Sequence, residues 1–291
     1  MIYWMRRHAG GVALTTVLAV CALLLGHNLW KYYVDAPWTR DGRVTADVVR
    51  IAPEISGTIS AVHVIENQFV HEGDILFQIS PERFQLAVEA AQADLDSALE
   101  AMKLDISTAE RNTKLEEKGS LSAEAAERSQ REAAAARAEA RSAEVALDVA
   151  KLNLKRTAVR APVDGYVTNL HLRKGDYAVT GDATVTLVDA GSFRVTGYFR
   201  ETQLARIKPG DPVRIGLMGV SGELQGHVES FGRGIANSNA ASDDLGLPLV
   251  EPVFSWVRLA QRIPVRIAID GVPSGIELAA GMTASVSLVT R

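Results

Sequence analysis

The chain has 291 residues, with 31 Lys and Arg against 35 Asp and Glu, and a single cysteine. A net charge of −4 excludes the basic footprint of a general nucleic-acid-binding protein, and one cysteine can form neither an intrachain disulfide nor a cysteine-rich zinc site. Hydrophobic residues make up 47% of the chain but aromatic residues only 6%, and 41 residues are alanine. The positions of the alanines are therefore informative about the fold.

The first predicted element is an apolar segment, Ala9 to Trp30, which contains no Asp, Glu, Lys or Arg. As a helix its 22 residues would span roughly 33 Å, enough to cross the core of a bilayer. A basic pair precedes the segment and aromatic residues follow it, as expected of an anchor: Arg6, Arg7, Tyr32 and Tyr33. We therefore predict a single transmembrane helix over residues 9–30, after a cytoplasmic tail over residues 1–8.

A cleaved signal peptide is the alternative interpretation of this segment. The apolar part of a signal peptide is usually about 7–15 residues long, and Pro37 directly follows the small-residue pattern Val34–Ala36, where it should block cleavage. The positive-inside rule places the chain after Lys31 across the inner membrane, in the periplasm of a Gram-negative cell. Residues 31–47 are assigned to a linker or membrane-proximal segment.

Residues 82–156 contain 19 alanines in 75 positions, no proline and one glycine, Gly119. Apolar or small residues recur there in steps of four and three on both sides of Gly119, the heptad spacing of packed helices. This predicts an antiparallel α-helical coiled-coil hairpin over residues 81–156, roughly 50 Å long, that turns at residues 118–120. The seam residues are Phe84, Val88, Ala91, Leu95, Ala98, Met102, Ile106, Ala109 and Thr113, then Ser122, Ala126, Ser129, Ala133, Ala136, Ala140, Ala143, Leu147, Ala150 and Leu154.

The segments on either side of the hairpin form a repeat with an offset of 108 residues, as between Gly57 and Gly165. Each half alternates apolar and polar residues and turns at Gly-Asp, and each is too short to bury a core alone. Two facing halves, residues 48–80 and 157–190, would make a small β-sandwich from which the hairpin projects. Further equivalent pairs are Ile59 and Val167, His63 and His171, Val64 and Leu172, Gly73 and Gly181, Asp74 and Asp182, and Ile79 and Leu187.

The last third, residues 191–291, has the pattern of short strands and turns. Lys208–Pro212 is a strong turn signal, and Gly232–Pro252 is long and polar, which predicts a mobile loop. Further strands are predicted at Val253–Leu259, Ile263–Ile269 and Met282–Val289.

The two repeat halves resemble the split biotinyl/lipoyl-like domain of HlyD-type periplasmic adaptor proteins, also called membrane fusion proteins. The Met-Lys-Met and Asp-Lys-Ala sequences of true carrier domains are absent. Residues 37–43 (PWTRDGR) and 256–266 (WVRLAQRIPVR) look like the AaeA-like and EmrA-like branch of efflux adaptors. The resemblance implies an elongated mixed α and β chain in which residues 191–291 form a β-barrel. Val44–Val48 would help to close either this barrel or a membrane-proximal layer.

The resemblance also suggests a docking site at the hairpin tip. Adaptors that dock TolC-type outer-membrane channels carry an Arg, a Leu four positions later and a Ser seven beyond that, which match Arg111, Leu115 and Ser122. A charged donor and an apolar side chain at an exposed tip suit capture of a partner's helical hairpin. The alternative is that Arg111 is only a solvated charge on a helix face and Ser122 only a helix cap.

No enzymatic site is predicted. The six histidines lack metal-binding spacing, and no nucleophile elbow or ATP-binding loop occurs. His63 and His171 are interpreted as polar residues of half-exposed strands. We therefore predict no catalytic residues, no metal and no cofactor, and place the energy source in another subunit.

The resemblance implies a periplasmic adaptor of a tripartite efflux pump, which links an inner-membrane transporter to a TolC-type outer-membrane channel. It further implies export of aromatic carboxylic acids or drugs, and self-association into a hexameric ring. The alternatives are an adaptor for type I protein secretion, whose hairpins are usually longer, and an anchored coiled-coil scaffold.

Overall fold

The computed structural model describes residues 14–24, 26, 36–235, 260–273 and 275–289. The chain divides into two compact units, one made of Val48–Gly191 and the other of Met1–Asp47 with Ser192–Arg291. The chain passes from one unit to the other twice, after Asp47 and before Ser192.

The second of these units contains a closed six-stranded barrel with the order β1-β10-β13-β12-β11-β14, all neighbours antiparallel. Alternate side chains point inward, and the fully buried ones include Val44, Val195, Phe199, Ile215, Val265 and Ile267. The strands are β1 (Trp38–Thr45), β10 (Arg194–Arg200), β11 (Pro212–Leu217), β12 (Glu223–Phe231), β13 (Arg262–Ile269) and β14 (Thr283–Leu288), and the one-turn helix α4 (Glu201–Leu204) follows β10.

The first barrel strand lies where the sequence indicated a linker. Residues 38–45 of the segment 31–47 form β1, which closes the barrel between β10 and β14. Gly42 is buried and lies so close to the backbone of β14 that a Cβ there would be 2.7 Å from the carbonyl oxygen of Ala284. The next strand, β2 (Val48–Ile51), belongs to the other unit. The segment Val44–Val48 is therefore divided between the two units, and only its first part lies in the barrel.

The other unit contains two four-stranded sheets, β2-β9-β7-β4 and β6-β5-β3-β8, over one apolar core. The repeat explains this order, because β2, β3, β4 and β5 are equivalent to β6, β7, β8 and β9, and each sheet takes two strands from each half. The remaining strands are β3 (Gly57–Val62), β4 (Phe69–Val70), β5 (Ile75–Ile79), β6 (Ala158–Arg160), β7 (Gly165–Thr168), β8 (Tyr177–Ala178) and β9 (Val185–Asp189).

The strand registers obey the same offset. Phe69 pairs with Tyr166 in one sheet, and the equivalent residues Tyr177 and Thr58 pair in the other. The turn glycines Gly73 and Gly181 both have positive φ, 90° and 87°. The two halves are therefore interleaved copies, and neither could complete a sheet without the other.

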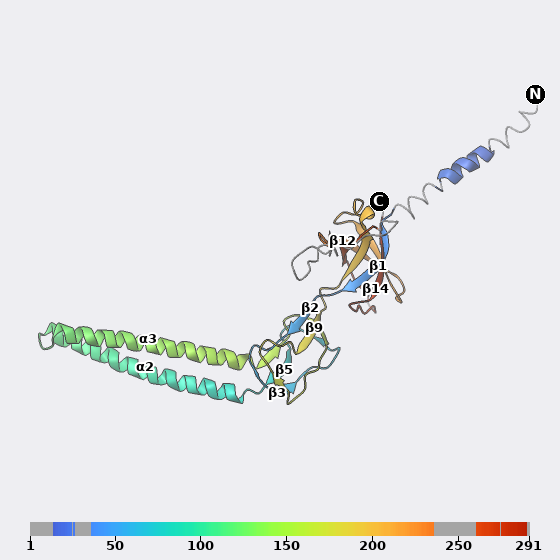
Figure 1. Ribbon diagram of the computed structural model, residues 1–291. Coiled ribbons are helices and arrows are strands. Elements are labelled where there is room, and N and C mark those ends of the chain that lie inside the picture. Colours follow the sequence, from blue (N-terminus) through green and yellow to red (C-terminus); the bar gives the residue numbers. More distant parts are fainter. Residues whose placement is uncertain (1–13, 25, 27–35, 236–259, 274, 290–291) are drawn as a thin grey trace, which may run out of the picture. The chain divides into compact units, whose positions relative to one another are not determined.

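Two long helices separate the halves of the sandwich: α2 (Glu82–Glu117) and α3 (Ala123–Lys155). They lie side by side and run in opposite directions (Figure 1). Every seam residue except Ser122 is buried or half-buried. The buried ones are Ala109 on α2 and Ala126, Ser129, Ala133, Ala136, Ala140 and Leu147 on α3.

The N-terminal segment is only partly described. Residues 14–24 are helical, whereas residues 9–13, 25 and 27–30 of the predicted anchor lie outside the described residues. Within the described residues, no helix is both long enough and apolar enough to cross a membrane. The predicted strand Val253–Leu259 and nearly all of the predicted loop Gly232–Pro252 also lie outside them.

Candidate functional site

The tip between α2 and α3 is built as a Schellman motif. Gly119 has φ +69°, and its N–H donates to the carbonyl oxygen of Glu116 at 2.7 Å. The N–H of Ser120 donates to the carbonyl oxygen of Leu115 at 2.9 Å. These are the two hydrogen bonds of the motif, and the left-handed conformation between them favours glycine. The predicted turn at residues 118–120 is thus present, because Gly119 lets the chain reverse within five residues.

The three tip residues suggested by sequence lie on both sides of this turn. Arg111 and Leu115 are four residues apart on α2, so they share a face, and both are exposed. Ser122 is the N-cap of α3, where its hydroxyl accepts a hydrogen bond from the N–H of Ala125 at 3.4 Å. Ser122 therefore has a structural role that is independent of any docking role.

The base of the helices is tied to the sandwich by polar contacts. The hydroxyl of Thr157, which is 2% exposed, accepts a hydrogen bond from the Gln78 amide at 2.9 Å and donates to the carbonyl oxygen of Leu154 at 2.7 Å. Arg83 donates to the carbonyl oxygen of Ser56 at 3.1 Å, and Arg156 pairs with Glu54. The start of α2 and the end of α3 are thus each fixed to a neighbouring strand or turn.

Glu66 connects the two halves of the sandwich. Its carboxylate accepts hydrogen bonds from the backbone N–H groups of Asn169 and Leu170, at 2.9 and 2.8 Å. These bonds favour the charged form, so they lower the pKa of Glu66 below its ordinary value. This contact is not predictable from the sequence, because an isolated Glu in a turn carries no signal of its distant partner.

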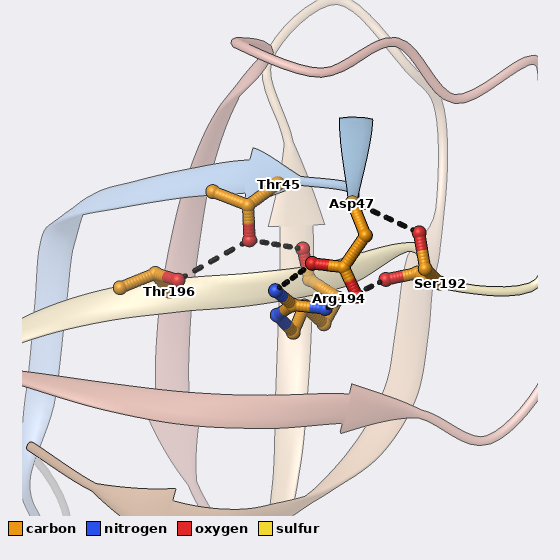
Figure 2. A network of polar contacts seen from close by, with 5 residues as sticks. All are labelled: Thr45, Asp47, Ser192, Arg194 and Thr196. Atoms are coloured by element: carbon orange, nitrogen blue, oxygen red, sulfur yellow. Dashed lines mark hydrogen bonds and ion pairs between the residues drawn. The ribbon is translucent and has the colours of Figure 1, made fainter. Parts of the chain in front are cut away.

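A polar network lies in the barrel unit where the chain leaves it, at Asp47, and returns to it, at Ser192 (Figure 2). Arg194 donates to both carboxylate oxygens of Asp47, at 2.6 and 3.1 Å, while the N–H of Asp47 donates to the hydroxyl of Ser192 at 2.7 Å. Thr45 and Thr196 extend the network, with their hydroxyls 3.3 Å apart. The hydrogen bonds from Arg194 lower the pKa of Asp47, and Asp47 in turn raises the pKa of Arg194.

No chemistry-bearing cluster appears in the part of the chain that the structure describes. His63 and His171 are exposed and lie just beyond the equivalent strands β3 and β7. No group of three or more His, Cys, Asp or Glu residues among the described positions could hold a metal ion.

Comparisons with known proteins match both units. Residues 192–289 match the family model of the AAEA-like β-barrel domain, and residues 47–190 match that of the barrel-sandwich hybrid domain of RND membrane fusion proteins. The chain is 42% identical over 274 residues to the uncharacterized protein YdhJ of Escherichia coli K12, covering 94% of this chain and 96% of that protein.

Solved structures share the fold at low sequence identity. The membrane fusion protein Spr0693 of Streptococcus pneumoniae R6 is 16% identical with a TM-score of 0.63, covering 86% of this chain and 98% of that one. MacA of Actinobacillus actinomycetemcomitans is 17% identical with a TM-score of 0.60, covering 88% and 79%.

A split barrel-sandwich that carries a helical pair, followed by this type of barrel, defines the membrane fusion proteins. The chain belongs to the HlyD-type family of periplasmic adaptors, as the repeat and its flanking motifs predicted.

Proposed function

We propose that this protein is the periplasmic adaptor of a tripartite efflux pump, linking an inner-membrane transporter to a TolC-type outer-membrane channel. The observation that carries the proposal is the long helical pair between the two halves of the sandwich, in a chain of the adaptor family. Aromatic carboxylic acids or drugs are the proposed cargo, on the resemblance to the AaeA-like branch alone. In this proposal the chain connects and gates, and catalyses no reaction.

The helical pair serves, in this proposal, as a coiled-coil hairpin that packs against copies of itself in a ring, a hexamer by family resemblance. Its outward surface supports this role, because large apolar side chains remain exposed there. Leu104 is 65% exposed, and Val145 and Val149, four residues apart on α3, are 57% and 52% exposed. Adjacent apolar side chains left in water on one helix face, as Val145 and Val149 are, favour a protein partner. Sedimentation of the full-length protein in detergent should detect oligomers, and a strict monomer at high concentration would contradict the ring.

The tip is the proposed contact with the outer-membrane channel. Arg111 would supply a charged donor, Leu115 an apolar side chain that is 37% exposed, and Ser122 a polar group beyond the turn. The test replaces Arg111 and Leu115 by Asp in a cell that depends on this chain for export. Export should be lost while the protein level stays normal, because the buried seam is untouched. Lys114→Asp, a charge reversal on the adjacent exposed position, is the matched control and should retain export.

Residues 9–30 are the proposed membrane anchor, with the N-terminus cytoplasmic and the remaining chain periplasmic. The support is the uncharged stretch of 22 residues with basic residues before it and aromatic residues after it. A reporter that is active only in the periplasm should be active when fused after Arg291. An inactive reporter at normal protein levels would overturn this topology.

A further inference from the structure

The outer face of three adjacent barrel strands, β1, β10 and β13, is rich in arginine. Directly opposed residues in an antiparallel ladder lie on the same side of the sheet. In this register Arg43 lies opposite Thr196, Thr196 opposite Arg266, and Arg200 opposite Arg262. We call the five exposed arginines on these strands the arginine face: Arg40, Arg43, Arg200, Arg262 and Arg266. This concentration of positive charge stands out in a chain whose net charge is −4.

The arginine face is only partly neutralised by the protein. Asp41 pairs with Arg262, and Asp47 interacts electrostatically with Arg266, whereas Arg43 and Arg200 form no ion pair with any described residue. Like charges directly opposite one another destabilise a strand pair, and Arg200 and Arg262 are in that arrangement. Asp41 offsets this repulsion at Arg262, and an external anion would neutralise the charge that remains on Arg200.

A groove at one end of the arginine face has the chemistry of a phosphate site. It has a volume of about 320 Å³, and three arginines outnumber the one carboxylate in its lining, Asp41, which pairs with Arg262. The full lining is Trp38, Thr39, Arg40, Asp41, Tyr198, Arg200, Gln203 and Arg262. Guanidinium groups present forked donors that match phosphate oxygens. Trp38 is 45% exposed, and Trp and Tyr favour the interface between water and lipid. Arginine and interfacial aromatic residues together fit a phospholipid headgroup better than a free inorganic ion.

The sequence keeps this face close to the proposed anchor. Trp38 begins β1 and follows Trp30, the end of the uncharged stretch, by eight residues. Even a fully extended chain of that length reaches only about 28 Å, at about 3.5 Å per residue. If residues 9–30 span the membrane as proposed above, the start of β1 cannot move far from the bilayer surface.

We propose that the arginine face docks the barrel on anionic phospholipid headgroups of the membrane that holds the anchor, with a headgroup phosphate in the groove. This proposal rests on the proposed anchoring. Because charges act over about one Debye length, roughly 8–10 Å at 0.10–0.15 M salt, docking would be close and weakened by salt. An acidic protein surface is the competing occupant of the same face.

The test measures how close the barrel lies to lipid headgroups in the full-length chain. The native cysteine is replaced (Cys21→Ser), and Thr196→Cys, in the middle of the arginine face, carries a fluorescent donor. Energy transfer to acceptor-labelled headgroups is compared in nanodiscs of phosphatidylcholine alone and of phosphatidylcholine mixed with phosphatidylglycerol. The test variant is Arg200→Glu with Arg266→Glu. The matched control is Arg137→Glu with Arg141→Glu, which reverses two exposed charges on α3.

Energy transfer should be higher in the anionic discs for the parent and the control, and the increase should vanish at high salt and in the test variant. Equal transfer in both lipids would overturn the proposal and leave the acidic protein surface as the occupant. An increase that persists in the test variant would also overturn it. A chain that enters no disc at all would contradict the anchoring, and the lipid docking that depends on it, and is recognised because it also fails with phosphatidylcholine alone.

Discussion

Arg194 donates hydrogen bonds to both carboxylate oxygens of Asp47, at 2.6 and 3.1 Å, where the chain leaves the barrel unit. Asp47 is the last residue before the sandwich strand β2, and Ser192, bonded to its N–H, is the first residue on return. These contacts therefore join the residue at which the chain leaves the barrel unit to the residues at which it returns, as Figure 2 shows. Its geometry is bidentate, which gives more directional strength than a single contact between surface charges.

Replacing Asp47 by Asn should lower the melting temperature of the protein in a pH-dependent way. The folded-state pKa of Asp47 is lowered by Arg194, so the stabilisation is fully present above the ordinary Asp pKa of about 3.9 and is lost as the pH falls through the lower folded-state value. Parent and variant should thus differ at pH 7 and converge in strong acid. Thermal unfolding followed by circular dichroism across this pH range measures the difference. Asp94→Asn, on the exposed face of α2, should leave the melting temperature almost unchanged at pH 7, and a difference that stayed constant into strong acid would contradict the assignment.

Glu66→Gln should weaken the contact between the two halves of the sandwich. The carboxylate accepts two backbone hydrogen bonds from the other half, and an amide can accept only with its single oxygen. We expect faster amide hydrogen exchange at Asn169 and Leu170 than in the parent protein. Glu72→Gln, an exposed acidic residue of the same half, is the matched control. Unchanged exchange in Glu66→Gln would show that solvent or another group replaces the carboxylate.

The sequence predicted a sandwich of two repeated halves and a helical pair because both have a strong periodic signal. It placed the halves face to face, whereas each sheet takes two strands from each half. The repeat fixes which strands are equivalent, and the seam spacing identified Ala133 and Leu147 as facing inward, where the structure buries them. The sequence did not predict the first barrel strand, because the inward positions of this strand are Thr39, Gly42 and Val44, of which only the last is strongly apolar. Its outward positions carry arginines, which suggest a solvated linker unless the pairing with β10 and β14 is known.

The candidate sites were predictable to different degrees. Gly119 marked the tip from sequence alone, since a lone glycine in a proline-free helical stretch signals a left-handed cap. The pair of Asp47 and Arg194 was not predictable, because its members are 147 residues apart and neither belongs to a motif. The docking residues Arg111, Leu115 and Ser122 rest on family resemblance, so their role depends on the export experiment.

Gly119→Val should destabilise the tip. A β-branched residue held at a φ of +69° costs roughly 1–2 kcal/mol in local conformational free energy, enough to open the two hydrogen bonds of the turn. We expect faster amide hydrogen exchange at Ser120 and reduced export, with little change in global melting temperature. Ser120→Ala is the control, because Ser120 contributes its backbone N–H and not its hydroxyl. Normal protection of the Ser120 amide in Gly119→Val would contradict the Schellman geometry.

The close approach of α2 and α3 depends on alanine in the seam, and enlarging one of these side chains tests it. Ala133 is 3% exposed, whereas its neighbour Ala134 is exposed on the same helix. Because Ala133 is buried, Leu in its place has to displace neighbouring side chains, and it should destabilise the helical pair by about 1–3 kcal/mol, the usual range for overpacking. Leu in place of Ala134 adds the same volume and nearly the same helix propensity where there is room, so it should have almost no effect on stability. Urea unfolding of both variants, followed by the helical circular dichroism signal, compares the two; equal loss would show that helix separation does not depend on the seam.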